Sequence, residues 1–354
     1  MKIAIAAGGT GGHVFPGLAV AEQLMALGHD VVWLGTEQGF EARVLADRPI
    51  AARWIRIAGV RGKGVSTLLA APLRLLRAIS ECWLALRAER PDVLLGLGGF
   101  VAGPTGLAAW LRRIPLVIHE QNAAAGLTNR ALSRIATVNL QAFPGAIAGA
   151  EVVGNPVRSS FADLPDPAVR QSDEGEPVRL LVVGGSQGAK ALNQIVPAAL
   201  ARLPAALRPR VTHQGGRTVA VAEAAYAQAA VDADIIPFID DIASAYATAD
   251  LVVCRSGALT VAELAAAGCA SILVPFPAAV DDHQTANAAY LADAGAALLM
   301  PEATLSPERL AEALRPLLTD RARRLSMAEQ ARTLAWPDAC QRIVDVCLQA
   351  GGRA

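Results

Sequence analysis

A glycine-rich turn near the start of the chain carries residues that could do chemistry. It reads Gly8-Gly9-Thr10-Gly11-Gly12-His13 and lies between an apolar run, residues 2–7, and a helix that we expect to open at Leu18. A strand that leads through glycines into a helix presents backbone N–H groups to an anion, and glycine lets a ligand approach the backbone closely. A plain phosphate loop needs no histidine. Because the ordinary pKa of histidine is about 6.5, His13 could act as a general base near neutral pH.

Two further glycine turns follow strand-like runs in the second half of the chain. Residues 184–188 read GGSQG, and residues 255–257 read RSG. In the later turn, the glycine can form the bend, and Ser256 or Thr260 can cap the following helix and donate to a phosphate. Glu263 falls in the first turns of that helix. Its carboxylate could accept hydrogen bonds from a ribose diol, or it could merely complement the helix dipole.

The first two turns do not match the common phosphate motifs. A dinucleotide fingerprint counted from Gly9 needs glycine at its sixth position, where the sequence has Val14. Glu37 is a weak substitute for the acidic residue expected after the second strand. A P-loop needs Lys and then Ser or Thr directly after its last glycine, but Ala189 follows Gly188. We therefore expect diphosphate or sugar binding without hydride transfer or ATP hydrolysis.

Composition limits the remaining functions. A chain of 354 residues with 53% hydrophobic residues can form two domains. Its formal net charge is zero, so no overall field attracts nucleic acid. The five cysteines contain no CxxC pair and fit neither a zinc site nor a disulfide framework, which indicates a reducing cytoplasm. We expect no secretion signal and no spanning helix, because the apolar runs are short, and hence a protein that is soluble or attached to a membrane surface.

The elements that must position these turns alternate between strands and helices, which is typical of an α/β protein with a doubly wound parallel sheet. The expected strands are residues 2–7, 30–35, 54–57, 93–97, 116–119, 137–140, 178–183, 210–212, 235–237, 251–253 and 271–274. The expected helices are residues 18–27, 68–87, 101–111, 129–135, 189–200 and 338–349. The order strand, glycine turn, helix of residues 2–24 begins again at residue 178, so we predict two similar domains. Residues 157–177 are polar and rich in proline, which predicts a linker or surface loop.

Several long motifs, in order along nearly the whole chain, resemble the MurG family of bacterial transferases. They are GGTGGHVFPGLAVA at 8–21, GVRGKG at 59–64, IHEQNAAAGLTN at 118–129, VVGNPVR at 152–158, VVGGSQGA at 182–189, and FIDD and CRSGALTVAE within 238–263. This family adds N-acetylglucosamine (GlcNAc) from UDP-GlcNAc to the undecaprenyl-pyrophosphoryl-MurNAc-pentapeptide carrier of peptidoglycan synthesis. The resemblance implies a GT-B fold, in which two Rossmann-like domains face a cleft. It implies an acceptor and membrane domain at 1–158, a UDP-GlcNAc domain at 159–336, and a C-terminal helix, 337–354, that packs back on the first domain.

The resemblance also implies which residues contact the donor. The matching positions are Thr10, Gly11, Gly12, Asn122, Arg158, Ser186, Ile239, Ala258, Leu259, Thr260, Val261, Ala262, Glu263 and Gln284. Ile239 would hold the uracil through its backbone, Ser186 would meet the diphosphate, and Glu263 would take the ribose. Asn122 and Gln284 would lie near the sugar, although the segment before Gln284 departs from the family pattern in length and composition.

The implied reaction is an inverting displacement, in which the acceptor's 4-hydroxyl attacks the anomeric carbon while UDP leaves. A base should remove the hydroxyl proton. His13 is the best candidate, with hydrogen bonding to a sugar or the backbone as the alternative role. Glu120 is the rival base because it follows a strand end, a position that commonly faces a site. His119 is expected to pack beneath the loop.

Charge that develops on UDP could be stabilised by helix N-termini and Arg158, so we expect neither a cofactor nor a metal. The carboxylate pairs Asp240-Asp241 and Asp281-Asp282 occur in turn-like contexts. We interpret them as solvated turn residues rather than metal ligands.

A lipid acceptor requires contact with a membrane. Leu75, Leu76 and Trp83 lie among cations in one predicted helix, and Trp110 and Arg112 form a second such cluster. Taken alone, this mixture suits an ordinary core-facing helix with a basic edge, but the resemblance favours an interfacial patch on an anionic membrane. It implies a peripheral protein on the cytoplasmic face of the inner membrane. UDP-GlcNAc and the undecaprenyl-linked lipid are the implied partners, other cell-wall synthesis proteins are candidate partners, and nucleic acid is not.

Two other functions remain open on the sequence. A UDP-GlcNAc 2-epimerase could use the same fold without a lipid acceptor or a membrane patch. A non-catalytic nucleotide-sugar sensor or scaffold would bind the donor and leave His13 and Glu120 idle.

Overall fold

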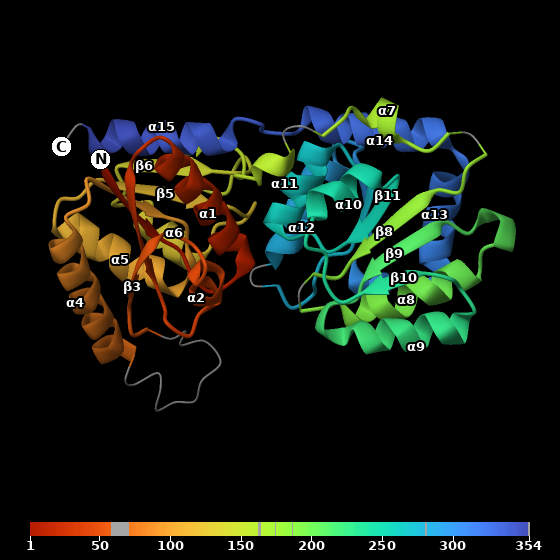
Figure 1. Cartoon of the computed structure of the whole chain (residues 1–354), viewed down its shortest axis with the longest axis horizontal. Helices are drawn as coiled ribbons and strands as arrows, with labels where there is room; N and C mark the ends of the chain where they lie inside the picture. The colour runs from red at the N-terminus through yellow and green to blue at the C-terminus, as the bar shows by residue number, and fades with distance from the viewer. Residues whose placement is uncertain (58–70, 162–163, 174, 186, 280–281, 353–354) are drawn as a thin grey trace. The chain divides into compact units, whose positions relative to one another are not determined.

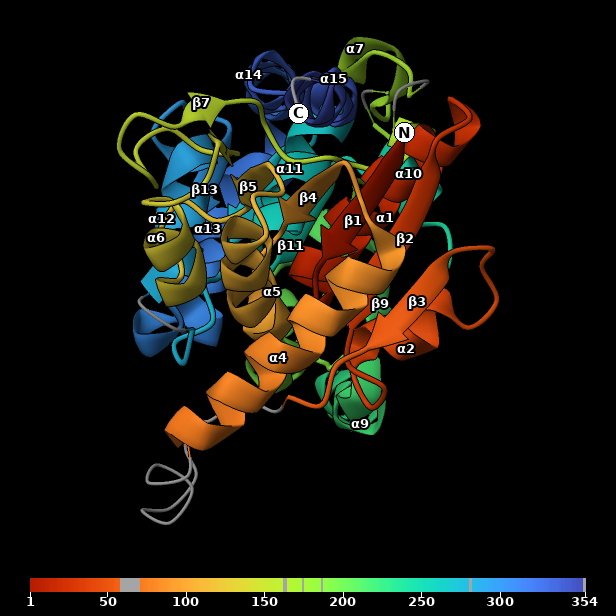
Figure 2. The same cartoon turned by 90° about the vertical axis from the view of Figure 1, so that its left-hand side faces the viewer.

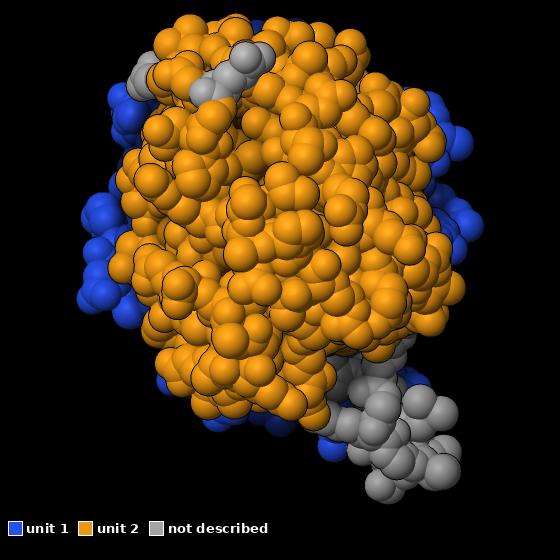
Figure 3. Space-filling view, turned by 90° about the vertical axis from the view of Figure 1, so that its right-hand side faces the viewer, with its two compact units in different colours: residues 1–157, 336–354 blue, residues 158–335 orange. Residues whose placement is uncertain are grey.

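The computed structural model describes residues 1–57, 71–161, 164–173, 175–185, 187–279 and 282–352. The chain divides into two compact units (Figure 1). Unit 1 comprises Met1–Val157 and Trp336–Ala354, and unit 2 comprises Arg158–Ala335, as coloured in Figure 3. Among the residues described, no helix is both long and apolar enough to cross a membrane.

Unit 1 contains a seven-stranded sheet in which neighbouring strands are parallel. Its strands are β1 (Lys2–Ala6), β2 (Asp30–Gly35), β3 (Ala51–Trp54), β4 (Val93–Gly96), β5 (Leu116–Glu120), β6 (Val138–Gln141) and β7 (Glu151–Val152). The order β3-β2-β1-β4-β5-β6-β7 reverses direction between β1 and β4. In open α/β sheets, ligands bind beyond the carboxyl ends of the strands at such a switch point.

Helices cover both faces of this sheet. The described helices of unit 1 are α1 (Gly11–Ala26), α2 (Phe40–Leu45), α4 (Ala71–Glu89), α5 (Gly99–Leu111), α6 (Leu127–Leu132) and α15 (Ala339–Gly351). Alternate residues of β1 enter two cores, as the period of a strand requires. Ile3 and Ile5 pack with α1 and α15, and Ala4 and Ala6 pack with α4 and α5. Figure 2 shows α4 and α5 side by side.

Unit 2 repeats this topology. Its strands are β8 (Arg179–Val183), β9 (Arg210–Gln214), β10 (Asp234–Ile236), β11 (Leu251–Cys254), β12 (Ser271–Leu273) and β13 (Ala297–Leu299). All pair in parallel in the order β10-β9-β8-β11-β12-β13, so the switch point lies between β8 and β11. The prediction of two similar doubly wound domains is confirmed.

Helices also surround the second sheet. They are α7 (Pro167–Arg170), α8 (Lys190–Ala201), α9 (Val219–Ala229), α10 (Ile242–Thr248), α11 (Ala258–Ala267), α12 (His283–Ala292), α13 (Pro307–Thr319) and α14 (Arg321–Thr333), with the short 3-10 turns η1 (Ser159–Phe161), η2 (Ala205–Leu207), η3 (Gly216–Thr218) and η5 (Glu302–Thr304). Leu180 and Val182 of β8 pack in one core with α8, α9 and α13.

Several sequence-based bounds were wrong. Helix α1 begins at Gly11 rather than Leu18, so His13 lies in its first turn. Strand β3 ends at Trp54, where the predicted strand began, and β7 and β13 were missed. β3 is a short edge strand whose residues are mostly exposed, so it has no apolar run that the sequence could reveal.

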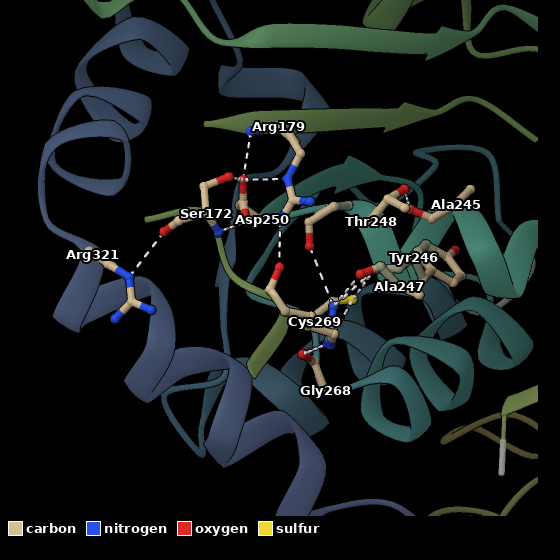
Figure 4. Close-up of polar contacts among 12 residues, drawn as sticks. Ser172, Arg179, Ala245, Tyr246, Ala247, Thr248, Asp250, Gly268, Cys269 and Arg321 are labelled. Carbon is tan, nitrogen blue, oxygen red and sulfur yellow. Dashed lines mark hydrogen bonds and ion pairs between the residues drawn. The ribbon is translucent and has the colours of Figure 1, made fainter. Parts of the chain in front are cut away.

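The stretch predicted as a linker or surface loop packs in its described parts on the rest of unit 2. Phe161 is 2% exposed, and its ring centroid lies 6.0 Å from that of Tyr246. The Asp166 side chain caps α7 by accepting from the backbone N–H of Ala168 at 2.8 Å. Arg170 donates to carbonyl oxygens at the ends of α10 and α11. Figure 4 labels two of these acceptors, Tyr246 and Gly268. The prolines and acidic residues therefore belong partly to caps and docking contacts rather than to a free loop.

Candidate active site

The first glycine turn is tied to strand β2 by a buried carboxylate. Glu41 of α2 is 0% exposed. Its Oε2 accepts from the backbone N–H of Gly9 at 3.2 Å, and its Oε1 accepts from the backbone N–H and the hydroxyl of Thr36 at 2.8 and 2.6 Å. Sequence reasoning missed Glu41 and considered Glu37, which is exposed. The turn is therefore held from the neighbouring strand as well as by its own backbone.

His13 lies at the switch point of unit 1. Thr10 is the N-cap of α1, and its carbonyl accepts from the backbone N–H of His13 at 3.1 Å. The ring of His13 is half-buried, and its Nδ1 lies 2.8 Å from Oε1 of Gln121. A Cβ at Gly98, just after β4, would lie 3.1 Å from Cε1 of His13, so a glycine here leaves room for the imidazole. Residues from the ends of β1, β4 and β5 thus meet at one point.

His119, the first polar residue of the IHEQN motif, is buried as predicted. His119 is 0% exposed, and its Nε2 lies 2.9 Å from the carbonyl oxygen of Gly154. Burial lowers the pKa of His119 to about 4, and the carbonyl of Gly154 only partly opposes that shift. His119 is therefore a neutral group beneath the loop near pH 7.

Glu120, the rival base, is engaged by its own loop. It is 2% exposed. Its Oε1 accepts from the backbone and side-chain nitrogens of Asn122 at 3.0 and 3.3 Å, and its Oε2 accepts from the backbone of Gly126 at 3.1 Å and from Nδ2 of Asn129 at 2.9 Å. This geometry is better suited to shaping the loop that carries Asn122 than to taking a proton. The half-exposed imidazole of His13 is the more accessible of the two candidate bases.

The second glycine turn packs closely on the loop after β9. A Cβ at Gly188 would lie 2.2 Å from Oγ1 of Thr218 and 2.6 Å from the carbonyl oxygen of Gly215, so only glycine fits. Asn193 of α8 donates to the same two atoms at 2.9 and 3.1 Å. Ser186 lies outside the described residues, and its assignment to the diphosphate stays a prediction.

The third turn differs in detail from its prediction. The N-cap of α11 is Gly257, whereas Ser256 is 0% exposed and donates its hydroxyl to the carbonyl of Gln284 at 2.8 Å. Neither of the two expected residues is therefore the cap, because Thr260 lies within α11. Oε1 of Gln284 accepts from the backbone N–H of Phe276 at 2.9 Å, which ties the loop after β12 to the start of α12. Helix α11 also carries the predicted run Ala258 to Ala262 in its first turns.

Two residues that were predicted to contact UDP-GlcNAc, Glu263 and Arg158, interact with each other electrostatically. Glu263 is 6% exposed, and burial raises its pKa to about 7, while the positive charge of Arg158 acts in the opposite direction. Arg158 also acts on Asp241, whose pKa is lowered chiefly by the hydroxyl of Ser244. Ile239, half-buried, lies just before this turn. Unit 2 thus places a cation, Arg158, and a carboxyl group that ionises near pH 7, Glu263, near the N-terminal turns of α10 and α11.

The acidic pairs behave as turn residues where they are described. Asp240 and Asp241 are exposed, and Asp241 caps α10 by accepting from the backbone N–H of Ser244 at 3.0 Å. Asp282 is exposed and accepts from the hydroxyl of Thr285 at 2.7 Å. Asp281 lies outside the described residues.

The predicted membrane residues fall into two environments. Leu75 and Leu76 in the first turns of α4 are 47% and 61% exposed, and Trp110 at the end of α5 is 50% exposed. Trp83 and Arg112 are half-buried, and the guanidinium carbon of Arg112 lies 4.9 Å from the centroid of the Trp83 ring. The leucines at the start of α4 are therefore exposed rather than packed in the core, whereas Trp83 takes part in a cation–π contact. The GVRGKG motif lies outside the described residues.

Comparison with known proteins decides the family. Residues 3–140 match the Glycosyltransferase family 28 N-terminal domain, and residues 179–343 match the Glycosyltransferase family 28 C-terminal domain. The solved structure of Acinetobacter baumannii MurG superposes with a TM-score of 0.87 at 44% identity, covering 98% of this chain and 99% of that one. A curated relative from Marinobacter nauticus is 54% identical over 97% of this chain and 96% of its own. The chain belongs to the MurG family.

A second relative, from Alkalilimnicola ehrlichii, is 55% identical over 99% of both chains. Both relatives are named UDP-N-acetylglucosamine--N-acetylmuramyl-(pentapeptide) pyrophosphoryl-undecaprenol N-acetylglucosamine transferase. Membership in the MurG family confirms the resemblance seen in the motifs, the GT-B fold and a glycosyltransferase activity. The roles of individual residues stay predictions.

Proposed function

We infer that this MurG-family chain is an inverting glycosyltransferase. It moves GlcNAc from UDP-GlcNAc to the 4-hydroxyl of undecaprenyl-pyrophosphoryl-MurNAc-pentapeptide, converting lipid I to lipid II in peptidoglycan synthesis. The observation that carries this conclusion is identity of 54–55% with transferases of that name over at least 96% of both chains. Neither relative offers support for a 2-epimerase.

Unit 2 is proposed to bind the donor. The N-terminal turn of α11 and the cation Arg158 suit a diphosphate. Glu263 suits the ribose hydroxyls once its carboxyl is ionised, and the backbone of Ile239 suits the uracil. As UDP leaves, negative charge develops on its diphosphate, and the helix N-terminus and Arg158 would stabilise it.

Unit 1 is proposed to activate the acceptor. His13 takes the proton of the 4-hydroxyl at its ring nitrogen, the hydroxyl oxygen forms a bond to the anomeric carbon, and the bond from that carbon to UDP breaks with its electron pair going to UDP. Support for His13 comes from its place at the switch point and its half-buried ring. Glu120, saturated by hydrogen bonds from its loop, is proposed to position that loop.

The enzyme is proposed to be peripheral on the cytoplasmic face of the inner membrane. The exposed leucines at the start of α4, with Arg74 and Arg77 also exposed beside them, suit an anionic lipid surface. Other cell-wall synthesis proteins are candidate partners on the same surface.

The deciding experiment is transfer of labelled GlcNAc from UDP-GlcNAc to a short-chain lipid I analogue. A disaccharide product with UDP release supports the proposal. Incubation with labelled UDP-GlcNAc alone should leave it unchanged, because only an epimerase would form UDP-ManNAc. Donor binding without turnover, when acceptor is supplied, would instead indicate a sensor.

A further inference from the structure

A chain of hydrogen bonds leads from a buried backbone carbonyl to the ring of His13. It begins at Gly154, whose carbonyl oxygen lies 2.9 Å from Nε2 of His119. A carbonyl oxygen only accepts, so Nε2 of His119 carries a hydrogen. Because burial lowers the pKa of His119 to about 4, the ring is neutral near pH 7 and its Nδ1 is a bare acceptor.

The side-chain amide of Gln121 is held in one orientation by two acceptors. Its Nε2 lies 3.1 Å from the backbone oxygen of His119 and 3.2 Å from Nδ1 of the same residue. The amide nitrogen has two hydrogens, one for each acceptor. A reversed amide would place an oxygen against both acceptors, so the hydrogen-bond network assigns the orientation. Gln121 is 1% exposed, and Nδ2 of Asn155 donates to its backbone oxygen at 2.9 Å, which fixes it further.

The amide oxygen of Gln121 therefore faces His13 and lies 2.8 Å from its Nδ1. An amide oxygen only accepts, so Nδ1 of His13 carries the hydrogen. We propose that His119 and Gln121 hold His13 in the Nδ1–H tautomer, which leaves the lone pair on Nε2 for the acceptor's proton. The catalytic part of this inference rests on the proposed role of His13 as the base, and Gln121 is a positioning residue.

In many enzymes the base that activates a nucleophile is itself oriented by a third group, and this arrangement is of that kind. Here the third group is a neutral amide rather than a carboxylate. A carboxylate beside the ring would favour the imidazolium before reaction. The amide of Gln121 selects the tautomer without adding that charge, and Nε2 is left to accept the proton. The hydrogen bond from Nδ1 persists in the imidazolium that forms.

The titratable groups facing this region are engaged elsewhere. His119 and Glu120 approach from β5, and Glu41 approaches the first turn from α2. His119 is neutral near pH 7. The carboxylate of Glu120 accepts from its own loop, and that of Glu41 accepts from the backbone N–H groups of Gly9 and Thr36. The described contact to Nδ1 of His13 is made by Gln121.

Nitrogen-15 NMR of the full-length protein, labelled at histidine, reports the tautomer of His13 independently of any activity measurement. The chain has five histidines, and the His13 resonances are assigned by their loss in His13→Gln. We expect the Nδ1–H form in the unsubstituted protein. In Gln121→Met, whose side chain offers no amide oxygen, we expect the ring to exchange between both tautomers. We expect kcat to fall by about 10- to 100-fold, with KM for UDP-GlcNAc changed by less than about twofold.

Gln141 offers a matched control. It is 4% exposed in the neighbouring strand β6, its Nε2 donates to the carbonyl of Ala150 at 2.9 Å, and its Oε1 accepts from the backbone N–H of Ile147 at 2.8 Å. Gln141→Met removes comparable hydrogen bonds from unit 1 without touching His13. We expect it to lower thermal stability while leaving the tautomer and kcat unchanged.

The unsubstituted protein tests the inference even where Gln121→Met fails to fold. An Nε2–H tautomer of His13 would overturn it, as would an unmixed Nδ1–H tautomer in a folded Gln121→Met protein. If the tautomer changes as expected but kcat does not, the inference about Gln121 stands. That result would instead overturn the proposed role of His13 as the base.

Discussion

The buried carboxylate of Glu41 accepts a hydrogen bond from the backbone N–H of Gly9 at 3.2 Å. It thereby joins the end of β2 to the turn that precedes His13. Glu41→Ala should remove the hydrogen bonds that the carboxylate accepts from the backbone N–H groups of Gly9 and Thr36, and a hydrogen bond to a charged group contributes about 1.5–3 kcal/mol. We expect a lower free energy of unfolding of that order in denaturant titration. The matched change Glu37→Ala, at an exposed residue, should stay within about 0.5 kcal/mol; equal losses in the two variants would contradict a tethering role.

His13→Ala should separate the two candidate bases. Loss of a general base typically costs 10²–10⁴-fold in turnover, and we expect a fall in kcat of about that size. Calorimetric binding of UDP-GlcNAc should be largely kept, because the donor is proposed to bind through unit 2. Glu120→Gln keeps an acceptor oxygen for the loop and should lose less activity than His13→Ala. Survival of turnover in His13→Ala would move the base role to Glu120.

The sequence predicted these two residues but not the ones that orient them. His13 lies soon after the end of β1 and Glu120 is the last residue of β5, and local patterning reveals such strand ends. The contact between His13 and Gln121 joins residues 108 positions apart, and the contact between Gly9 and Glu41 joins residues 32 positions apart. Such partners are chosen by strand order, and one sequence does not give their side-chain geometry.

The bounds of helices and strands likewise depend partly on local sequence, which can be predicted, and partly on tertiary packing, which cannot. Strand β2, Asp30–Gly35, was predicted to the residue because its apolar run is continuous and bounded by polar residues. The start of α1 was placed too late, because glycine has a low helix propensity. Burial of Val14 and Leu18 against β1 overrides that preference and continues the helix back to Gly11.

The raised pKa of Glu263 predicts a pH-dependent donor affinity. The carboxyl ionises as the pH rises through about 7, and only the ionised form is a full acceptor for ribose hydroxyls. Affinity for UDP-GlcNAc, measured by calorimetry, should therefore rise through that range, by at most about tenfold per pH unit. UDP-GlcNAc is the better ligand for this measurement, because the terminal phosphate of UDP itself titrates near pH 6. A Glu263→Gln protein should bind more weakly above pH 7, with the dependence flattened; an unchanged profile would remove Glu263 from the site.

The raised pKa of Glu263 also determines how its contribution to the free energy of unfolding changes with pH. The folded pKa of about 7 lies above the ordinary value of 4.5, so the folded state binds more protons than the unfolded state between these pH values. The contribution of Glu263 to the free energy of unfolding is therefore greatest below about pH 4.5 and declines as the pH rises towards 7. Glu263→Gln should remove this decline from denaturant titrations of the protein.

The start of α4 should control attachment to membranes. Replacing both Leu75 and Leu76 by Glu places carboxylates where exposed leucines would enter an anionic interface, so cosedimentation with anionic vesicles should be lost. Calorimetric binding of UDP should not change. Val169→Glu is a suitable control, since Val169 is 80% exposed and lies in unit 2. Vesicle binding that persists in the double variant would reject this surface.

Arg170 should be important to the stability of unit 2, although it lies in the stretch predicted as a linker or surface loop. Its Nη1 donates to the carbonyl of Tyr246 at 3.0 Å, and its Nη2 donates to the carbonyls of Ala267 and Gly268 at the C-terminal end of α11. The planar guanidinium reaches both helix ends at once, which a lysine ammonium cannot reproduce. Arg170→Ala should therefore lower the free energy of unfolding by about 2–4 kcal/mol, and Arg170→Lys should restore only part of that loss.

Arg210 provides the comparison for this last prediction. Its side chain is 72% exposed and pairs with Glu176 at 3.9 Å, an arrangement that contributes about 0–1 kcal/mol. Denaturant titration should place Arg210→Ala close to the unsubstituted protein and Arg170→Ala well below it. Because α11 also carries Glu263, the Arg170 variants should lose donor affinity along with stability. Retention of both properties in Arg170→Ala would mean that the docked stretch neither stabilises unit 2 nor positions α11.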